Sequence, residues 1–204
     1  MIAALFVETD GCYFGLKDVE PWDEKANALY YQDDYPVIAH PPCQRWGRFW
    51  HGSTRKPHQF ELGDDGGCFR SALTSVWRCG GLLEHPADSR AFSHFGLPIP
   101  KRGAGWTKED QYGGRSCYVE QGHYGHPSRK PTWLYAVDIV FAELIWDRGE
   151  QVLPQWMIDR YGYEKARRIG VVAMIGGKDK TKKRNATPEG FRDLLLLLAE
   201  TVRA

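Results

Sequence analysis

The sequence predicts an α/β fold in which a mostly parallel sheet is flanked by helices. Two short apolar runs, Val37–Ala39 and Gly81–Leu83, predict buried strands. Between them, residues 67–79 place large apolar side chains at helical spacing, and Gly80 ends that segment. A strand, a helix and a strand in this order form a parallel pair with a right-handed crossover. The 204 residues are enough for one domain with a real core.

The other elements of the core follow from the same periodicities. The predicted strands are 2–7, 36–39, 81–84, 117–121 and 132–140, with the last two side by side. A short helix is expected at 23–31, and another near 89–95 within the loop-rich stretch 87–116. We expect residues 1–150 to form the catalytic core.

Residues 151–204 are expected to pack on that core as C-terminal helices and a basic loop. The predicted elements are a helix at 153–169, a short strand at 171–175, a basic loop at 176–185 and a last amphipathic helix. Thr187 is expected as the N-cap of this helix and Pro188 as its first residue. Its leucines at 194–198 suit docking on the sheet and would also suit a dimer contact, so the oligomeric state stays open.

Composition limits the function classes. The chain is 42% hydrophobic and 26% charged, as is ordinary for a globular protein. Its net charge of +1 gives no global attraction to nucleic acid, so any DNA binding depends on local patches. The 5 cysteines form no CxxC pair, which argues against zinc or other metal sites and against a disulfide framework. With no secretory signal and no apolar run long enough to span a bilayer, we expect a cytoplasmic protein without a membrane partner.

The most informative feature is the sequence Pro41-Pro42-Cys43. Two prolines stop the preceding strand and stiffen the turn, because each fixes its own φ and lacks an N–H. The turn therefore holds one thiol rigidly at the tip of a strand, as a nucleophilic cysteine requires. A buried packing thiol is the alternative interpretation.

Two later motifs follow in order. The strand at 81–84 ends in Glu84-His85-Pro86, and ligands bind at such strand ends in open α/β sheets. Further on, Tyr124-Gly125-His126-Pro127 leads through Ser128, Arg129 and Lys130 into the strand at 132–140.

This order of motifs over residues 4–137 resembles the DNA cytosine-C5 methyltransferase family, and implies a reduced, Rossmann-like methyltransferase fold. In that family a cysteine adds to C6 of a flipped-out pyrimidine. The resemblance implies that Cys43 is the nucleophile and Glu84 contacts the N3 edge, with a raised pKa that lets it donate a proton. Lys130, with Arg129 as its neighbour, would bind the O2 edge or a phosphate.

Further residues near these motifs are candidates for substrate contact. Those expected at the base are Pro42, Gln44, Arg45, Trp46, His85, Tyr124 and His126, with the segment 45–65 closing over it as a loop. Those expected at DNA phosphates are Arg48, Lys180, Lys182, Lys183 and Arg184. His40 and His85, each beside a proline at a strand end, could act as a base or hold the thiolate.

The S-adenosylmethionine end of the family pattern is eroded. Phe6 and Gly11 fit it, and Glu24 matches the acidic residue that binds a ribose. Glu8 and Asp10, however, stand where the family has glycines that let a ligand approach the backbone. The strand whose turn holds the adenine does not fit before Pro36, and the family's target-recognition domain is missing. S-adenosylmethionine is therefore a possible cofactor, and the donor stays unknown.

The leading interpretation is a transferase that modifies a pyrimidine in DNA at C5 or at its 5-methylene substituent. Thiolate addition at C6 also expels a leaving group from a 5-methylene carbon, where an amine or amino acid donor can then add. Such chemistry suits phage thymine hypermodification in the bacterial host cytoplasm. The alternatives are an S-adenosylmethionine-dependent DNA cytosine-C5 methyltransferase, a non-catalytic DNA-binding protein, and an enzyme acting on free pyrimidine nucleotides.

Overall fold

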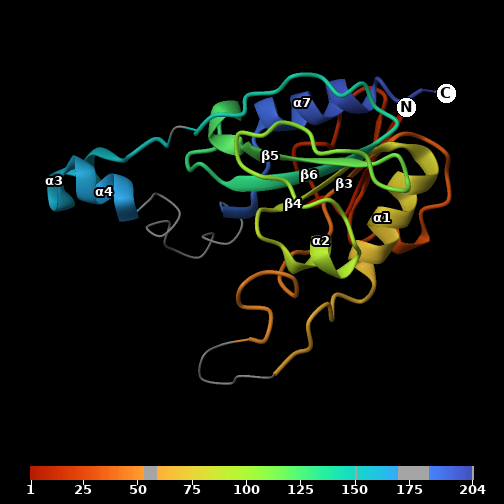
Figure 1. The fold of residues 1–204 in the computed structure, drawn as a ribbon, viewed down its shortest axis with the longest axis horizontal. Helices are drawn as coiled ribbons and strands as arrows, with labels where there is room; N and C mark the ends of the chain where they lie inside the picture. The colour runs from red at the N-terminus through yellow and green to blue at the C-terminus, as the bar shows by residue number, and fades with distance from the viewer. Residues whose placement is uncertain (53–58, 150, 170–183, 204) are drawn as a thin grey trace.

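A mixed six-stranded sheet with the order β2-β1-β3-β4-β6-β5 forms the centre of the fold (Figure 1). The computed structural model describes residues 1–52, 59–149, 151–169 and 184–203. The strands are β1 (Ile2–Leu5), β2 (Val19–Trp22), β3 (Val37–Ala39), β4 (Gly81–Pro86), β5 (Arg115–Glu120) and β6 (Pro131–Val137). Strands β1 to β4 pair in parallel, whereas β6 runs antiparallel to both β4 and β5. The predicted α/β class is confirmed, but the sheet is only partly parallel.

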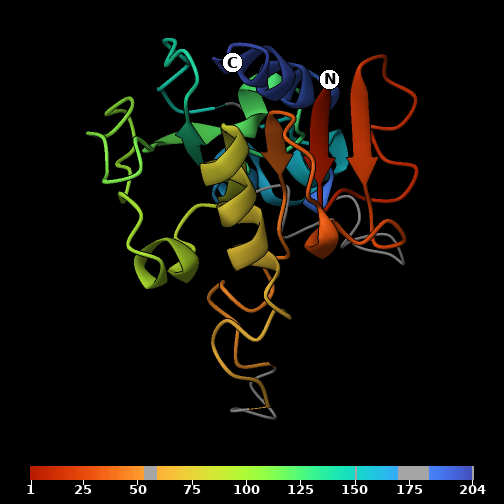
Figure 2. The same ribbon diagram turned by 90° about the vertical axis from the view of Figure 1, so that its right-hand side faces the viewer.

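Helices cover both faces of this sheet (Figures 1 and 2). Helix α1 (Cys68–Cys79) packs on one face through Phe69, Leu73 and Val76. Helix α7 (Glu189–Ala199) packs on the other face through Phe191, Leu195 and Leu198, which are spaced by one helical turn or two. The predicted docking of the leucine-rich segment on the sheet is therefore confirmed.

The remaining described helices are short. They are η1 (Ala28–Tyr30), α2 (Arg90–His94), η2 (Gln121–Tyr124), α3 (Gln155–Tyr161) and α4 (Tyr163–Ile169). Helices α3 and α4 lie beside the main body in Figure 1. No helix in the described ranges is long and apolar enough to cross a membrane.

Several element boundaries differ from the sequence prediction. The helix expected at 23–31 is only the single turn η1, and β2 precedes it without having been predicted. The helix expected at 153–169 is broken at Gly162, whose φ of 74° is not helical. Helix α7 begins at Glu189, so Pro188 takes the cap position expected for Thr187. The predicted strand at 171–175 and most of the basic loop lie outside the described residues.

The topology brings distant segments to one edge of the sheet. Because β1, β3 and β4 are parallel, the segments that follow them leave the sheet at the same edge. Because β6 is antiparallel to β4, its first residues reach that edge too, with Thr132 opposite Pro86. The segment after β3 projects away from this edge in Figure 2.

Candidate functional site

Cys43, Glu84 and Lys130 meet at this edge of the sheet. Cys43 follows β3 on the double-proline turn, Glu84 lies on β4, and Lys130 immediately precedes β6. Cys43 is half-buried and Glu84 is buried. The three lie close enough for the charges of Glu84 and Lys130 to change the pKa of the Cys43 thiol.

A chain of hydrogen bonds holds the Glu84 carboxylate. His40 Nδ1 lies 3.0 Å from one carboxylate oxygen, and Gln121 Nε2 donates to the other at 3.2 Å. The same Gln121 amide also donates to the Thr132 hydroxyl at 2.9 Å. On the other side, the Tyr13 hydroxyl lies 2.8 Å from His40 Nε2. Both ring nitrogens of His40 are thus engaged, so His40 positions Glu84 and is not free to act on a substrate itself.

These partners keep Glu84 ionised. Burial alone would raise the pKa of Glu84, but the His40 hydrogen bond and the positive charge of Lys130 outweigh it and lower the pKa to about 2. The raised pKa that the sequence analysis expects is therefore wrong for this structure. The reason is that the carboxylate sits among donors and cations rather than in an apolar pocket.

The Cys43 thiol is protonated in this arrangement. Burial raises its pKa above the ordinary value, and the negative charge of Glu84 raises it further. Lys130 and a backbone hydrogen bond act in the opposite direction without cancelling these effects. The structure therefore shows an ionised carboxylate beside a neutral thiol.

Lys130 is the basic residue that reaches this cluster. The pKa of Lys130 is lowered because burial outweighs the opposing effects of Glu84 and Cys43. Its ammonium group donates to the carbonyls of Asn185 and Ala186, each at 2.9 Å, and so ties the segment before α7 to the site. The pKa of the adjacent Arg129 is instead lowered, first by burial and then by the positive charges of nearby arginines.

Two predicted base contacts belong to the core instead. Trp46 is 2% exposed, donates from Nε1 to Asp65 and packs against Phe69, because its indole completes the packing around α1. His85 is buried against the same Phe69 ring, and burial lowers its pKa to about 4. The neutral, buried His85 ring supports the turn and is not accessible to a base.

Tyr124 is half-buried against helix α7, and His126 is buried. The Tyr124 ring contacts Phe191 of α7, and burial raises the pKa of its hydroxyl. His126 is buried, with Nδ1 engaged by the backbone and hydroxyl of Ser128. Both side chains shape the turn before β6 rather than line a base site.

The other predicted contacts lie at the surface after Cys43. Pro42, Gln44 and Arg48 are exposed, and Arg45 is half-buried with its guanidinium over the Phe60 ring. Their positions are compatible with substrate contact, which stays a prediction. The predicted phosphate contacts at Lys180, Lys182 and Lys183 lie outside the described residues, and Arg184 is half-buried.

The loop after β1 does not present the residues that the family uses for S-adenosylmethionine. Phe6 has a positive φ and packs against the core cluster, and a side chain at Gly11 would meet the Glu8 carbonyl. The Thr9 hydroxyl donates to Asp23 at 2.6 Å and so ties this loop to the segment after β2.

The acidic segment after β2 fits this cofactor no better. The Asp23 carboxylate accepts hydrogen bonds from the Thr9 hydroxyl and from the N–H groups of Lys25 and Ala26, and the Glu24 side chain is exposed. Residues 23–36, all within the described ranges, contain no strand that would carry an adenine-binding turn. The residues present therefore do not fit S-adenosylmethionine as this family holds it.

Two residues of the cluster, Tyr13 and Gln121, were not among the predicted site residues, and His40 has a different role from the one expected. Tyr13 and Gln121 carry no motif, and only tertiary contacts reveal them. His40 had a sequence signal, because it precedes the double proline, but its partner is Glu84 and not the thiol.

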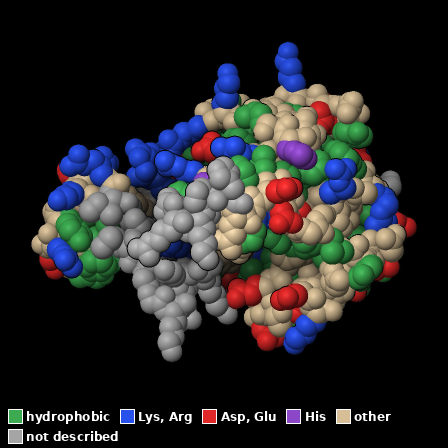
Figure 3. All heavy atoms as spheres, turned by 90° about the horizontal axis from the view of Figure 1, so that it is seen from below, with side chains coloured by type: hydrophobic (Ala, Val, Ile, Leu, Met, Phe, Trp, Pro, Cys, Tyr) green, Lys and Arg blue, Asp and Glu red, His purple; other side chains and the backbone are tan. Residues whose placement is uncertain are grey.

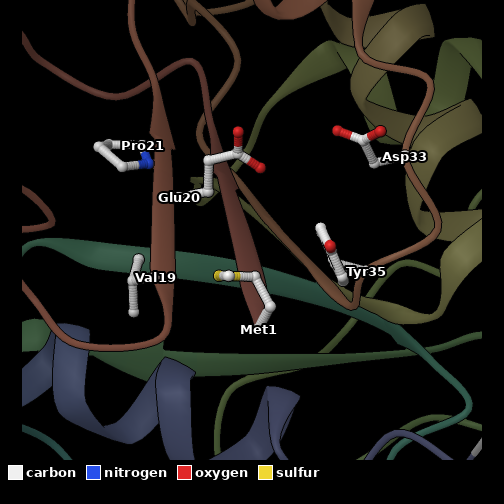
Figure 4. Close-up of a pocket in the computed structure, with 6 residues that line it drawn as sticks. All are labelled: Met1, Val19, Glu20, Pro21, Asp33 and Tyr35. Atoms are coloured by element: carbon white, nitrogen blue, oxygen red, sulfur yellow. The ribbon is translucent and has the colours of Figure 1, made fainter.

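A surface hollow lies away from this cluster. It is lined by Met1, Val19, Glu20, Pro21, Asp33 and Tyr35, near the first residues of β1 and β2 (Figure 4). None of its lining residues belongs to the Cys43 cluster, so it does not describe the catalytic candidate. Within the described ranges, no group of three metal-ligating side chains lies together.

Comparisons with protein-family models, with curated proteins and with solved structures found no match to this chain.

Proposed function

We propose that this protein is a transferase that modifies a pyrimidine base in DNA through a covalent bond between Cys43 Sγ and C6 of the ring. The observation that supports the proposal most directly is the meeting of Cys43, Glu84 and Lys130 at one sheet edge from three separate segments. Those are the residue types that this chemistry needs: a nucleophile, a hydrogen-bonding acid and a cation. The mixed α/β sheet is compatible with a reduced methyltransferase-like fold.

The resting charges suggest how the nucleophile is activated. Glu84 is ionised and Cys43 is a neutral thiol, so one proton separates the resting site from the reactive one. The thiol proton passes to the Glu84 carboxylate only after a bound base has raised the pKa of Glu84 and lowered that of the Cys43 thiol, and this transfer then produces both reactive forms together. The thiolate can then attack C6, and the neutral carboxyl can donate to N3 of the base. Lys130 stabilises the negative charge that develops on the ring.

The group added at C5 follows from the same adduct. When Sγ bonds to C6, electron density moves to C5. A 5-methylene group that carries a leaving group loses it with its bonding electrons and becomes an exocyclic methylene. An amine or other nucleophile adds to that carbon, and the returning electrons expel Sγ from C6. We favour this course over methylation because the loop after β1 does not fit S-adenosylmethionine.

Isotope exchange tests the adduct without a known donor. Reversible addition at C6 exchanges the C5 hydrogen of cytosine with solvent, so DNA incubated with the enzyme in deuterated water should gain deuterium at that position. DNA with 5-hydroxymethyl pyrimidine should likewise exchange its hydroxyl oxygen in ¹⁸O-labelled water. Mass spectrometry of the digested nucleosides measures both.

Matched cysteine variants make the result specific. Cys43→Ala should abolish exchange, whereas Cys68→Ala, at another half-buried cysteine, should leave it intact. DNA binding without exchange on either substrate would instead support a non-catalytic DNA-binding protein. Exchange on free nucleotides that equals exchange on DNA would support an enzyme of nucleotide metabolism.

A further inference from the structure

Arg129 lies on the turn that carries the catalytic candidate Lys130, and three arginines from other parts of the chain are near enough to interact with its charge. Arg129 immediately precedes Lys130, and its pKa is lowered first by burial and then by the positive charges of Arg148, Arg102 and Arg167. Glu120 is the acidic group that opposes them there. Arg102 follows α2, Arg148 follows β6 and Arg167 lies on α4, so only the fold brings them together.

The Glu120 carboxylate already has hydrogen-bond partners inside the protein. Its carboxylate is fully buried and accepts hydrogen bonds from Arg102, from the Tyr118 hydroxyl at 2.8 Å and from the Gly149 N–H at 2.9 Å. It therefore fixes Arg102 in place and does not neutralise the group as a whole. Two other acidic residues nearby, Asp147 and Glu164, are exposed and pair with His123 and Arg167.

The positive charge that remains has unsatisfied donors. Arg129 Nε is buried without a hydrogen-bond partner, and Arg148 is exposed without an ion pair among the described residues. A buried donor left unpaired costs free energy, which the oxygens of an anion would recover. In Figure 3, Lys and Arg side chains gather on the side of the molecule that carries α3 and α4.

We propose that Arg102, Arg129, Arg148 and Arg167 form a binding site for the phosphate groups of a nucleic-acid strand. This proposal rests on the proposed function, because it places the phosphates next to the base that Cys43 would attack. Arginine suits the task, since its planar guanidinium donates several hydrogen bonds to phosphate oxygens. The chain thereby gains a local attraction to DNA although its net charge is only +1.

Salt-dependent binding of a single-stranded oligonucleotide tests this site. Arg148→Gln and Arg129→Gln should each weaken binding and reduce the slope of log affinity against log salt by about 0.7, the value for one phosphate contact. Arg203→Gln removes the same charge from an exposed residue beyond α7 and should leave the slope unchanged. The proposal is overturned if the two cluster variants behave like Arg203→Gln.

Two further measurements separate the outcomes. If a pyrimidine mononucleotide loses as much affinity as the oligonucleotide in the cluster variants, the site binds a free nucleotide and the nucleic-acid assignment is wrong. If the wild-type protein shows no exchange while the salt slopes change as expected, the catalytic proposal fails and the phosphate site stands.

Discussion

The ionised state of Glu84 predicts a specific dependence of stability on pH. The folded-state pKa of Glu84 is lowered from 4.5 to about 2, which corresponds to a stabilisation of about 3 kcal/mol when the carboxylate is ionised. Because the folded pKa lies below the unfolded one, this contribution is fully present above about pH 4.5. It is lost as the pH falls through about 2.

Glu84→Gln isolates this contribution, since glutamine keeps the shape but does not titrate. The free energy of unfolding is measured in urea for both proteins between pH 6 and pH 2.5. We expect the advantage of the wild-type protein over Glu84→Gln to shrink by most of the predicted 3 kcal/mol, most steeply below about pH 4.5. The same substitution at the exposed Glu24 controls for the general loss of a carboxylate.

Two results would refute the reasoning. A difference that stays constant over the whole range would mean that the His40 and Lys130 interactions do not favour the carboxylate. A difference that changes between pH 5 and pH 7 would mean that the pKa of Glu84 is raised. Glu84 would then be protonated in the resting protein, and the proposed proton transfer from Cys43 would be unnecessary.

Further predictions concern the surroundings of Glu84. Lys130 lowers the pKa of the Cys43 thiol, so Lys130→Met should slow the alkylation of Cys43 by iodoacetamide at pH 8. Peptide mass mapping measures this rate, and equal or faster labelling would contradict the prediction. Tyr13→Phe removes the hydrogen bond to His40 and should cost about 1 kcal/mol in urea unfolding, so a neutral result would count against the Tyr13–His40 contact. Trp46→Ala should cost about 3–5 kcal/mol because the indole is in the core, and an unchanged stability with selective loss of DNA binding would return Trp46 to the base site. Calorimetry should detect no saturable binding of S-adenosylmethionine, and clear binding would restore the methyltransferase alternative.

The strongly periodic parts of the fold were predictable from sequence. Helix α1 repeats large apolar side chains at helical spacing and ends at Gly80, so both its type and its end are local properties. Strand β2 was missed because its four half-buried residues include Glu20 and Pro21 and show no alternation. Its strand character comes from pairing with β1, which is a tertiary effect. The antiparallel direction of β6 likewise depends on how the preceding loop turns, and no residue pattern encodes it locally.

The candidate site residues that could be predicted are those whose neighbours in the sequence fix their position. The double proline before Cys43 and the strand end at Glu84 identify themselves through their local sequence. The residues that hold Glu84 and its partner His40 do not, because Gln121 and Tyr13 come from other segments of the chain. Trp46 and Tyr124 were assigned to the base for a related reason. An aromatic side chain suits stacking and core packing equally, and only burial distinguishes the two.

The loop after β1 shows how a departure from a family pattern can itself carry meaning. In the sequence, Glu8 and Asp10 in place of glycines look like decay of a cofactor site. In the structure the same loop is anchored by the bond from Thr9 to Asp23 and delivers Tyr13 to His40, which in turn holds Glu84. The loop thus supports Glu84, the acid of the proposed base chemistry. On the proposed function, this exchange of roles accounts for a catalytic half of the pattern without the donor half, and the second substrate is to be sought among nucleophiles that reach a 5-methylene carbon.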